Sequence, residues 1–174
     1  MNDLALRQYP IGKFSPKESY TPEERQRFIH SIETLPGELD QLVKNFTTAQ
    51  WATPYREGGW TARQVVHHVA DSHMNAYIRV KWALTEDAPL IKAYDEKAWA
   101  TTPEVASDPS LSINLLYALH AKWVTLLRGI SEVQLTRSFI HPATGKPNTI
   151  ERMMALYSWH GEHHLGHLKL VAAE

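Results

Sequence analysis

The sequence contains no cysteine. This absence excludes disulfide bonds, thiolate nucleophiles and zinc sites with cysteine ligands. Any transition-metal site in the chain must therefore be built from histidine, aspartate or glutamate side chains. If the chemistry of the protein requires a thiol, a substrate has to supply it.

Long apolar runs and a strong net charge are also missing. No run approaches the ~20 apolar residues of a membrane-spanning helix, so we expect no membrane partner. The formal net charge is -1, which gives no electrostatic basis for binding nucleic acid. The N-terminal stretch MNDLALRQYPIGKF lacks the basic and apolar regions of a secretion signal. We therefore expect a cytoplasmic protein with one domain over residues 1–174.

Apolar residues at helical spacing predict four long helices. These helices are expected over residues 21–46, 61–86 and 110–128, and from residue 150 to the C-terminus. Capping boxes, in which Thr is followed three residues later by Glu or Gln, open the first two helices at Thr21 and Thr61. Pro36 and Gly37 interrupt the first helix, where we expect a kink or a break into two helices.

The segments outside these helices differ in character. Residues 1–20 have no helical period and predict an extended arm that lies on the body of the protein. Residues 47–60 predict a loop, 131–136 one further helical turn, and 141–148 a turn or small hairpin. The connection over 87–109 is too long for tight up-and-down hairpins. The sequence thus predicts an all-α four-helix bundle with an extended N-terminal arm and a long connection between helices two and three.

Histidine is the main functional signal. Seven of the ten histidines fall in two short windows, HHVADSH over residues 67–73 and HGEHHLGH over 160–167. In the last helix, His160 and His164 stand one turn apart on the side that faces the bundle, at a spacing that lets two imidazoles share a divalent ion. His163 and His167 point further from the core, where they either contact a ligand ring from outside or face solvent.

The earlier window is expected to supply a third ring. His68 lies on a polar stripe that reaches the edge of the bundle, together with Asn75 and Arg79. His67 points to the outer face, and His73 points inward. We favour His68 as the ligand over His67 and, less strongly, over His73.

Other polar residues are candidate helpers. Asp71 follows His68 by three residues and is placed to orient a ligand ring. Arg79 is either a salt-bridge partner or a clamp for an anionic substrate. Tyr94 opens the aromatic and acidic stretch YDEKAW, which is either a solvated loop or a cover for a site. Glu162 points away and is a poor candidate for a general base.

Three histidines with a fourth position left open are typical of a catalytic zinc site, in which the ion activates a bound ligand. Imidazole also suits nickel. We therefore expect one divalent ion, Zn²⁺ or Ni²⁺, and a small-molecule substrate.

The sequence resembles the DinB-like superfamily, and within it the YfiT-like metal-dependent hydrolases, whose best-studied relatives are regarded as bacillithiol S-transferases. The matching stretches are YPIGKF, TPYREGGWTARQVVHHVADSHMNAYIR, YDEKAW and WHGEHHLGH, spread over nearly the whole chain. The resemblance implies a four-helix bundle, a homodimer, and one divalent ion per subunit held by His68, His160 and His164.

The resemblance also implies an activity. The primary interpretation is a metal-dependent hydrolase whose open position activates water or a substrate thiol. One alternative is an S-transferase in detoxification, acting on a low-molecular-weight thiol of the bacillithiol kind and an electrophile. Two others are a non-catalytic metal-binding or stress-response module and a helical dimerisation domain with incidental histidines.

Overall fold

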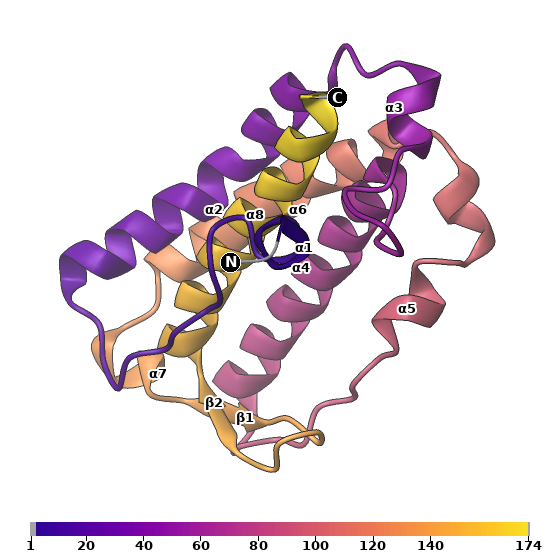
Figure 1. Ribbon diagram of the computed structural model, residues 1–174. Coiled ribbons are helices and arrows are strands. Elements are labelled where there is room, and N and C mark those ends of the chain that lie inside the picture. The colour runs from indigo at the N-terminus through magenta and orange to yellow at the C-terminus, as the bar shows by residue number, and fades with distance from the viewer. Residues whose placement is uncertain (1–2, 174) are drawn as a thin grey trace.

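Four long helices pack side by side in the computed structural model, which describes residues 3–173 (Figure 1). They are α2 (Pro22–Val43), α4 (Ala62–Thr85), α6 (Ser110–Arg128) and α8 (Ile150–Ala172). The predicted all-α four-helix bundle is confirmed, and each long helix lies where its apolar period predicted it. Within residues 3–173, no helix is both long enough and apolar enough to span a membrane.

Side-chain caps define where these helices begin. Thr21 and Thr61 each accept a hydrogen bond from the backbone N–H three residues later, and the side chains of Glu24 and Gln64 accept one from the backbone N–H of the cap residue. Both predicted capping boxes are therefore present. At the start of α8, Thr149 accepts from the backbone N–H of the third helical residue. These bonds satisfy N–H groups that have no partner within the helix.

The order of the helices around the bundle is not the order along the chain. α2 packs against α6 and α8, and α4 packs against the same two helices, so α2 and α4 lie on a diagonal. Arg25 joins the starts of α2 and α8 through Glu151 at 2.8 Å, and Arg63 joins the start of α4 to the carbonyls of residues 106 and 107, just before α6. Hence α2 runs parallel to α8, and α4 runs parallel to α6 (Figure 1).

Parallel α4 and α6 explain the long connection between them. The chain leaves the C-terminal end of α4 and has to return along the bundle to the end where α4 began, as Figure 1 shows. Two short helices interrupt this path. The smaller elements are α3 (Thr48–Ala52), α5 (Glu96–Trp99), the 3₁₀ helix η1 (Pro103–Ala106), α7 (Glu132–Leu135), β1 (Ser138–Ile140) and β2 (Pro147–Thr149). The predicted extra turn and small hairpin are present as α7 and the antiparallel pair β1–β2.

The prediction for the N-terminal arm was wrong in one respect. Residues Asp3–Gln8 form a short helix, α1, and the described part of the arm is irregular from Tyr9 to Tyr20, while residues 1–2 of the predicted arm lie outside the described residues. The sequence before Pro10 holds Leu, Ala, Arg and Gln, which all favour helix, and no Gly or Pro. The arm does lie on the body, because the indole of Trp159 on α8 donates to the carbonyl of Gly12 at 3.3 Å.

Pro36 does not break the first long helix, since α2 is continuous from Pro22 to Val43. A proline in a helix has no N–H, so the carbonyl four residues earlier loses its partner. That carbonyl belongs to Ile32, and it accepts a hydrogen bond from Nδ1 of His120 on α6 at 2.5 Å. A buried side chain of another helix thus replaces the missing backbone donor.

The core has two apolar clusters with a polar layer between them. One cluster lies toward the hairpin and includes Ile29, Val80, Trp123 and Met154. The other lies toward α3 and includes Leu39, Val66, Leu116 and Leu168. Between them, on α4, α6 and α8, lie His73, His120, His160 and His164. This layer is where the polar chemistry of the bundle is concentrated.

Candidate metal centre

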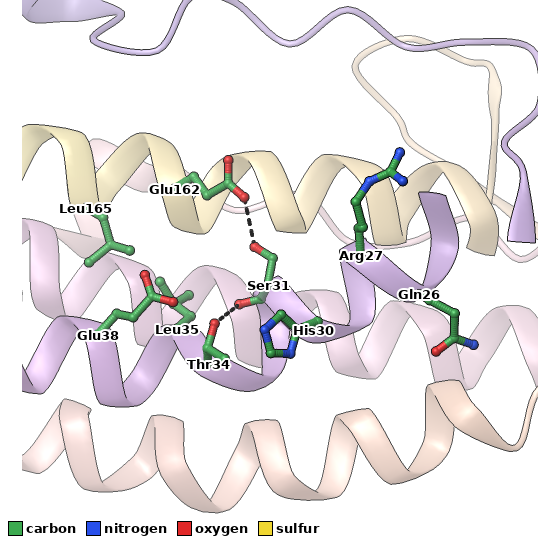
Figure 2. Close-up of a pocket in the computed structure, with 9 residues that line it drawn as sticks. All are labelled: Gln26, Arg27, His30, Ser31, Thr34, Leu35, Glu38, Glu162 and Leu165. Atoms are coloured by element: carbon green, nitrogen blue, oxygen red, sulfur yellow. Dashed lines mark hydrogen bonds between the residues drawn. The ribbon is translucent and has the colours of Figure 1, made fainter. Parts of the chain in front are cut away.

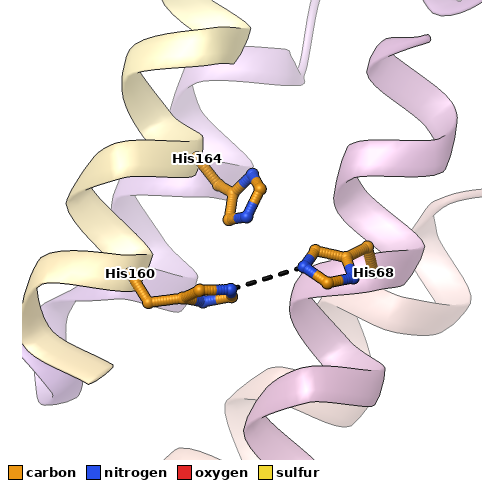
Figure 3. Close-up of side chains that lie close together, drawn as sticks. All are labelled: His68, His160 and His164. Carbon is orange, nitrogen blue, oxygen red and sulfur yellow. Dashed lines mark hydrogen bonds between the residues drawn. The ribbon is translucent and has the colours of Figure 1, made fainter. Parts of the chain in front are cut away.

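Two adjacent helices bring together the three predicted ligands (Figure 3). His68 extends from α4, and His160 and His164 extend from successive turns of α8, with their rings turned toward one another. Each offers one ring nitrogen, and these three atoms all lie within 4.8 Å of one another. Within residues 3–173, they are the only group of three or more histidines, aspartates or glutamates that meets this criterion.

The spacing of the rings suits a divalent ion. Nε2 of His68 lies 3.3 Å from Nε2 of His160. Two nitrogens bound to one tetrahedral ion at about 2.0–2.1 Å are themselves about 3.3 Å apart. Two rings therefore already stand at the separation that a shared ion requires, and His164 is close enough to complete the set.

Burial keeps these rings uncharged. It lowers the pKa of His68 to about 4, with a smaller contribution from His163, and it lowers the pKa values of His160 and His164 well below the usual range. His68 and His164 are buried, and His160 is partly exposed. A neutral imidazole has one nitrogen with a free lone pair, which is the form that binds a metal. The site is thus a set of neutral nitrogen donors with a route to solvent.

His73 points inward, as predicted, and contacts two other rings. It is fully buried, and its Nε2 lies 3.2 Å from Nδ1 of His160, while its Nδ1 lies 3.0 Å from Nε2 of His120. The sequence analysis did not identify His120 as a functional residue, because it stands alone on the apolar face of α6. The one available signal was Pro36, which implies an unpaired carbonyl at Ile32 in a neighbouring helix.

His163 and His167 point away from the bundle axis but are buried, because the N-terminal arm covers them. His163 stacks on Trp159, with ring centroids 4.5 Å apart, and His167 stacks on Tyr55 at 3.8 Å. His167 contacts a candidate ligand directly, since its Nδ1 lies 3.3 Å from Nδ1 of His164. Helical direction alone could not reveal this cover, because it comes from a distant segment.

His67 does not face solvent, so its predicted outer position was wrong. Its side chain is 5% exposed, and its Nδ1 lies 2.8 Å from Oγ of Ser112 on α6. The face of α4 that carries His67 is covered by α6, which the sequence analysis had no means to place beside it. His67 belongs to the contact between α4 and α6 and is turned away from the three candidate ligands.

The predicted helpers on α4 lie along one stripe. Asn75 is half-buried and donates from Nδ2 to the backbone carbonyl of Asp71. No hydrogen bond joins the Asp71 carboxyl to a histidine in residues 3–173, and burial raises the pKa of that carboxyl to about 6. Ser72 on the same stripe hydrogen-bonds the hydroxyl of Tyr157, a buried residue that the sequence analysis assigned only to the core.

Arg79 ends this stripe in an unusual environment. It is 8% exposed, its Nε is buried without a partner, and no ion pair or hydrogen bond to its guanidinium exists within residues 3–173. The guanidinium lies 5.9 Å from the ring centroid of Tyr94, which the long connection places over α4. Burial raises the pKa of Tyr94, so this phenol is neutral at physiological pH. Tyr94 therefore covers this end of the stripe, whereas the other five residues of YDEKAW are exposed.

A pocket of about 600 Å³ lies beside the histidines. Its lining includes Tyr55, whose ring stacks on His167, and Trp60, whose ring centroid lies 4.5 Å from that of His68. Arg56, Gln64 and Lys97 add polar groups to its walls. No histidine of the described chain lines this pocket, but two of its walls, Tyr55 and Trp60, contact the rings of His167 and His68, so it is the pocket next to the candidate metal centre.

A second pocket, of about 520 Å³, lies between α2 and α8 on the outside of the bundle (Figure 2). Its lining includes Glu162, whose Oε1 accepts from the hydroxyl of Ser31 at 3.0 Å, and the exposed His30. None of the clustered histidines lines it. Glu162 points away from the three rings, as predicted, so this pocket is separate from the candidate centre.

Comparison with known proteins identifies the family. A model of the DinB superfamily matches residues 31–168. The chain belongs to the DinB superfamily. Within it, the chain is 48% identical over 161 residues to "Putative metal-dependent hydrolase YfiT" of Bacillus subtilis (strain 168), covering 92% of this chain and 90% of that protein. A "Putative metal-dependent hydrolase" of Bacillus cereus (strain 03BB102) is 47% identical over 168 residues, covering 97% of this chain and 95% of that protein.

A solved structure supports the same placement among DinB proteins. YfiT from Bacillus subtilis matches this structure with a TM-score of 0.94 and 46% identity, covering 97% of each chain. That protein is described as having an unusual four-helix bundle topology. The family resemblance expected from the sequence motifs is confirmed.

Proposed function

We propose that this protein is a metal-dependent enzyme of the YfiT kind, with one divalent ion, Zn²⁺ or Ni²⁺, held by His68, His160 and His164. The observation that carries the proposal is the convergence of three neutral imidazoles, two of them 3.3 Å apart, beside a pocket open to solvent. A bound ion would supply Lewis-acid chemistry, lowering the pKa of a water or thiol and polarising a substrate oxygen. The printed names of the relatives, which describe metal-dependent hydrolases, agree with this proposal.

The pocket and the buried stripe assign further roles to the chain. The pocket of about 600 Å³ accommodates a small-molecule substrate, and Trp60 forms an apolar wall beside His68. Arg79 binds an anionic group of that substrate. Its buried guanidinium forms no ion pair within residues 3–173, the Glu96 carboxylate attracts it only from a longer distance, and a buried charge is costly unless a close partner completes it. Tyr94 packs over this guanidinium and limits its access to water.

Hydrolysis and thiol transfer make different demands on these residues. Hydrolysis needs a group that removes a proton from water, and within residues 3–173 no carboxylate belongs to the three-histidine group. A thiol has an ordinary pKa of about 8.5, against about 15.7 for water, so it ionises with much less help. The lack of a nearby carboxylate base therefore favours S-transfer as the second candidate function. In that reaction the thiol sulfur bonds to the electrophilic carbon, the leaving group departs with its electron pair, and the thiol proton passes to solvent.

Metal analysis of protein without an affinity tag tests the first part of the proposal. We expect about one ion per chain in the wild type, and loss of that ion in His68→Ala, His160→Ala and His164→Ala. His163→Ala is the matched control, since His163 is a buried histidine of α8 outside the group of three. Full metal content in all three ligand variants would exclude this site.

Activity assays then separate the candidate reactions. The metal-loaded protein is tested on a panel of esters and amides, and on several low-molecular-weight thiols with chlorodinitrobenzene as the electrophile. Turnover of the first panel supports hydrolysis, and thiol-dependent turnover of the second supports S-transfer. Both should disappear with a chelator and return with one particular ion. Tight metal binding with no turnover of either panel would instead support a non-catalytic metal-binding module.

A further inference from the structure

Three buried histidines outside the proposed ligand set, His73, His120 and His167, form two hydrogen-bonded chains that join His160 and His164 to backbone carbonyls. We propose that these chains hold His160 and His164 as Nδ1–H tautomers, so that the Nε2 lone pairs of both rings face His68 before an ion binds. His73, His120 and His167 are then positioning residues. This inference rests on the proposed metal site, which it deepens by assigning roles to three further histidines.

The first chain starts at the carbonyl of Ile32, which Pro36 leaves without its helical donor. A carbonyl can only accept, so Nδ1 of His120 carries the proton in their bond at 2.5 Å. Nε2 of neutral His120 must then accept from Nδ1 of His73 at 3.0 Å. Nε2 of His73 in turn accepts from Nδ1 of His160 at 3.2 Å. The single proton of His160 is thereby placed on Nδ1.

The second chain starts at the carbonyl of Gln8, the last residue of α1. Carbonyls in the last turn of a helix have no N–H partner within that helix. The carbonyl of Gln8 instead accepts a hydrogen bond from Nε2 of His167 at 3.2 Å. Nδ1 of neutral His167 must then accept, and its partner is Nδ1 of His164 at 3.3 Å. His164 therefore also carries its proton on Nδ1 and keeps the lone pair on Nε2.

The direction of both chains depends on each ring carrying one proton. A second proton would place a charge in the interior, and a buried charge is stable only with a paired opposite charge. Within residues 3–173, none of these five histidines forms an ion pair with a carboxylate. His73, His120 and His167 are each no more than 2% exposed, so water does not replace such a partner.

In both chains the proposed ligand ring donates its hydrogen bond to another imidazole. A metal-bound histidine usually donates its other N–H directly to a carboxylate, a carbonyl or water. Here one or two imidazoles stand between the ligand ring and the carbonyl. Both ligand rings are therefore fixed in tautomer and orientation by groups on α1, α2, α4 and α6, which links metal binding to the packing of the whole bundle.

Nitrogen NMR of metal-free protein labelled with ¹⁵N-histidine tests the tautomers directly. Long-range proton–nitrogen spectra distinguish Nδ1–H from Nε2–H rings, so the readout requires neither metal nor activity. In the wild type we expect His160 and His164 as Nδ1–H. His167→Phe, which retains an aromatic ring against Tyr55, should release the Nδ1–H preference of His164 and leave that of His160 unchanged.

Metal affinity gives the second readout, measured by competition with a chelator. Loss of a group that orients a metal ligand typically costs 10–100-fold in affinity, and we expect a loss of this order for His167→Phe. His167→Gln should restore much of it, because an amide also accepts and donates. His163→Phe is the control: it replaces a buried ring of the same helix turn that forms no hydrogen bond with a ligand ring, and it should keep both tautomer and affinity.

Circular dichroism identifies the variants that fold. If His167→Phe does not fold, His120→Phe tests the first chain, because it removes both hydrogen bonds of His120 and should release the Nδ1–H preference of His160 while leaving that of His164 unchanged. An Nε2–H tautomer of His160 or His164 in the wild type would overturn the inference, as would equal losses of affinity in His167→Phe and His163→Phe. Nδ1–H tautomers in a wild type that binds neither Zn²⁺ nor Ni²⁺ would uphold the chains and overturn the proposed metal site.

Discussion

Acid should lower the unfolding free energy of the metal-free protein, because its buried histidines would have to take up protons. The contribution of His120 to this loss can be measured separately. His120 is 1% exposed, and burial lowers its pKa from 6.5 to about 4. A group whose pKa is lower in the folded state contributes stability that is complete above its unfolded pKa and is lost as the pH falls toward its folded pKa. The loss should therefore fall between about pH 6.5 and pH 4.

The pKa difference sets the size of this loss. Each pKa unit corresponds to about 1.4 kcal/mol, so the protonation of His120 should cost about 3 kcal/mol of unfolding free energy by pH 4. His120→Gln removes the titrating group and can keep both hydrogen bonds, since an amide donates and accepts. Its unfolding free energy should thus decline less than that of the wild type over the same range, by about 3 kcal/mol.

Urea unfolding of the metal-free proteins at several pH values between 7 and 4 measures this difference. His30→Gln is the matched control, because it removes an exposed histidine of α2 and should leave the pH dependence of the wild type unchanged. Parallel stability curves for the wild type and His120→Gln would refute the reasoning, since they would mean that His120 binds its proton equally well in the folded and unfolded states.

Three further predictions concern other parts of the molecule. Arg79→Met should raise the KM for an anionic substrate by about 10–100-fold, the value of a charge-assisted hydrogen bond, and an equal effect on an uncharged analogue would contradict the proposed anion site. Gly161→Ala should lower the unfolding free energy by about 1 kcal/mol, because its Cβ would lie 2.6 Å from Cδ2 of Leu35. In thermal unfolding, the loss of stability caused by Gly161→Ala should be smaller in a Leu35→Val background, and an equal loss would contradict the clash. Thr61→Ala should cost about 1 kcal/mol by removing the capping box at the start of α4, and an unchanged midpoint in urea would show that the cap contributes nothing.

The agreement between sequence and structure is closest where the information is local. The caps Thr21 and Thr61, the spacing of four between His160 and His164, and the apolar periods of the long helices all involve residues within one or two turns of each other. Such patterns depend on backbone geometry and the nearest side chains, so they can be interpreted without knowing the rest of the fold. They were sufficient to predict the bundle and to single out His68 as the companion of the two rings on α8.

The disagreements come from contacts between distant segments. His67 is covered by α6, and His163 and His167 are covered by an arm that the sequence analysis left extended throughout. The periodicity of a single helix shows which residues share a face, but it does not show which neighbour covers that face. His120 was missed for the same reason, since its hydrogen-bond partners, Ile32 and His73, belong to two other helices of the bundle, α2 and α4.

The sequence alone therefore determined that this protein is a helical bundle with His160 and His164 one turn apart on the side that faces the bundle, because helix formation and ring spacing are local properties. Tertiary structure decided the diagonal arrangement of α2 and α4, the burial of His67, His163 and His167, and the hydrogen-bonded links from Ile32 and Gln8 to the candidate ligand rings. Those features depend on the positions of α1, α6 and the carbonyls of Ile32 and Gln8 in the folded protein. Such positions follow only from packing the whole chain.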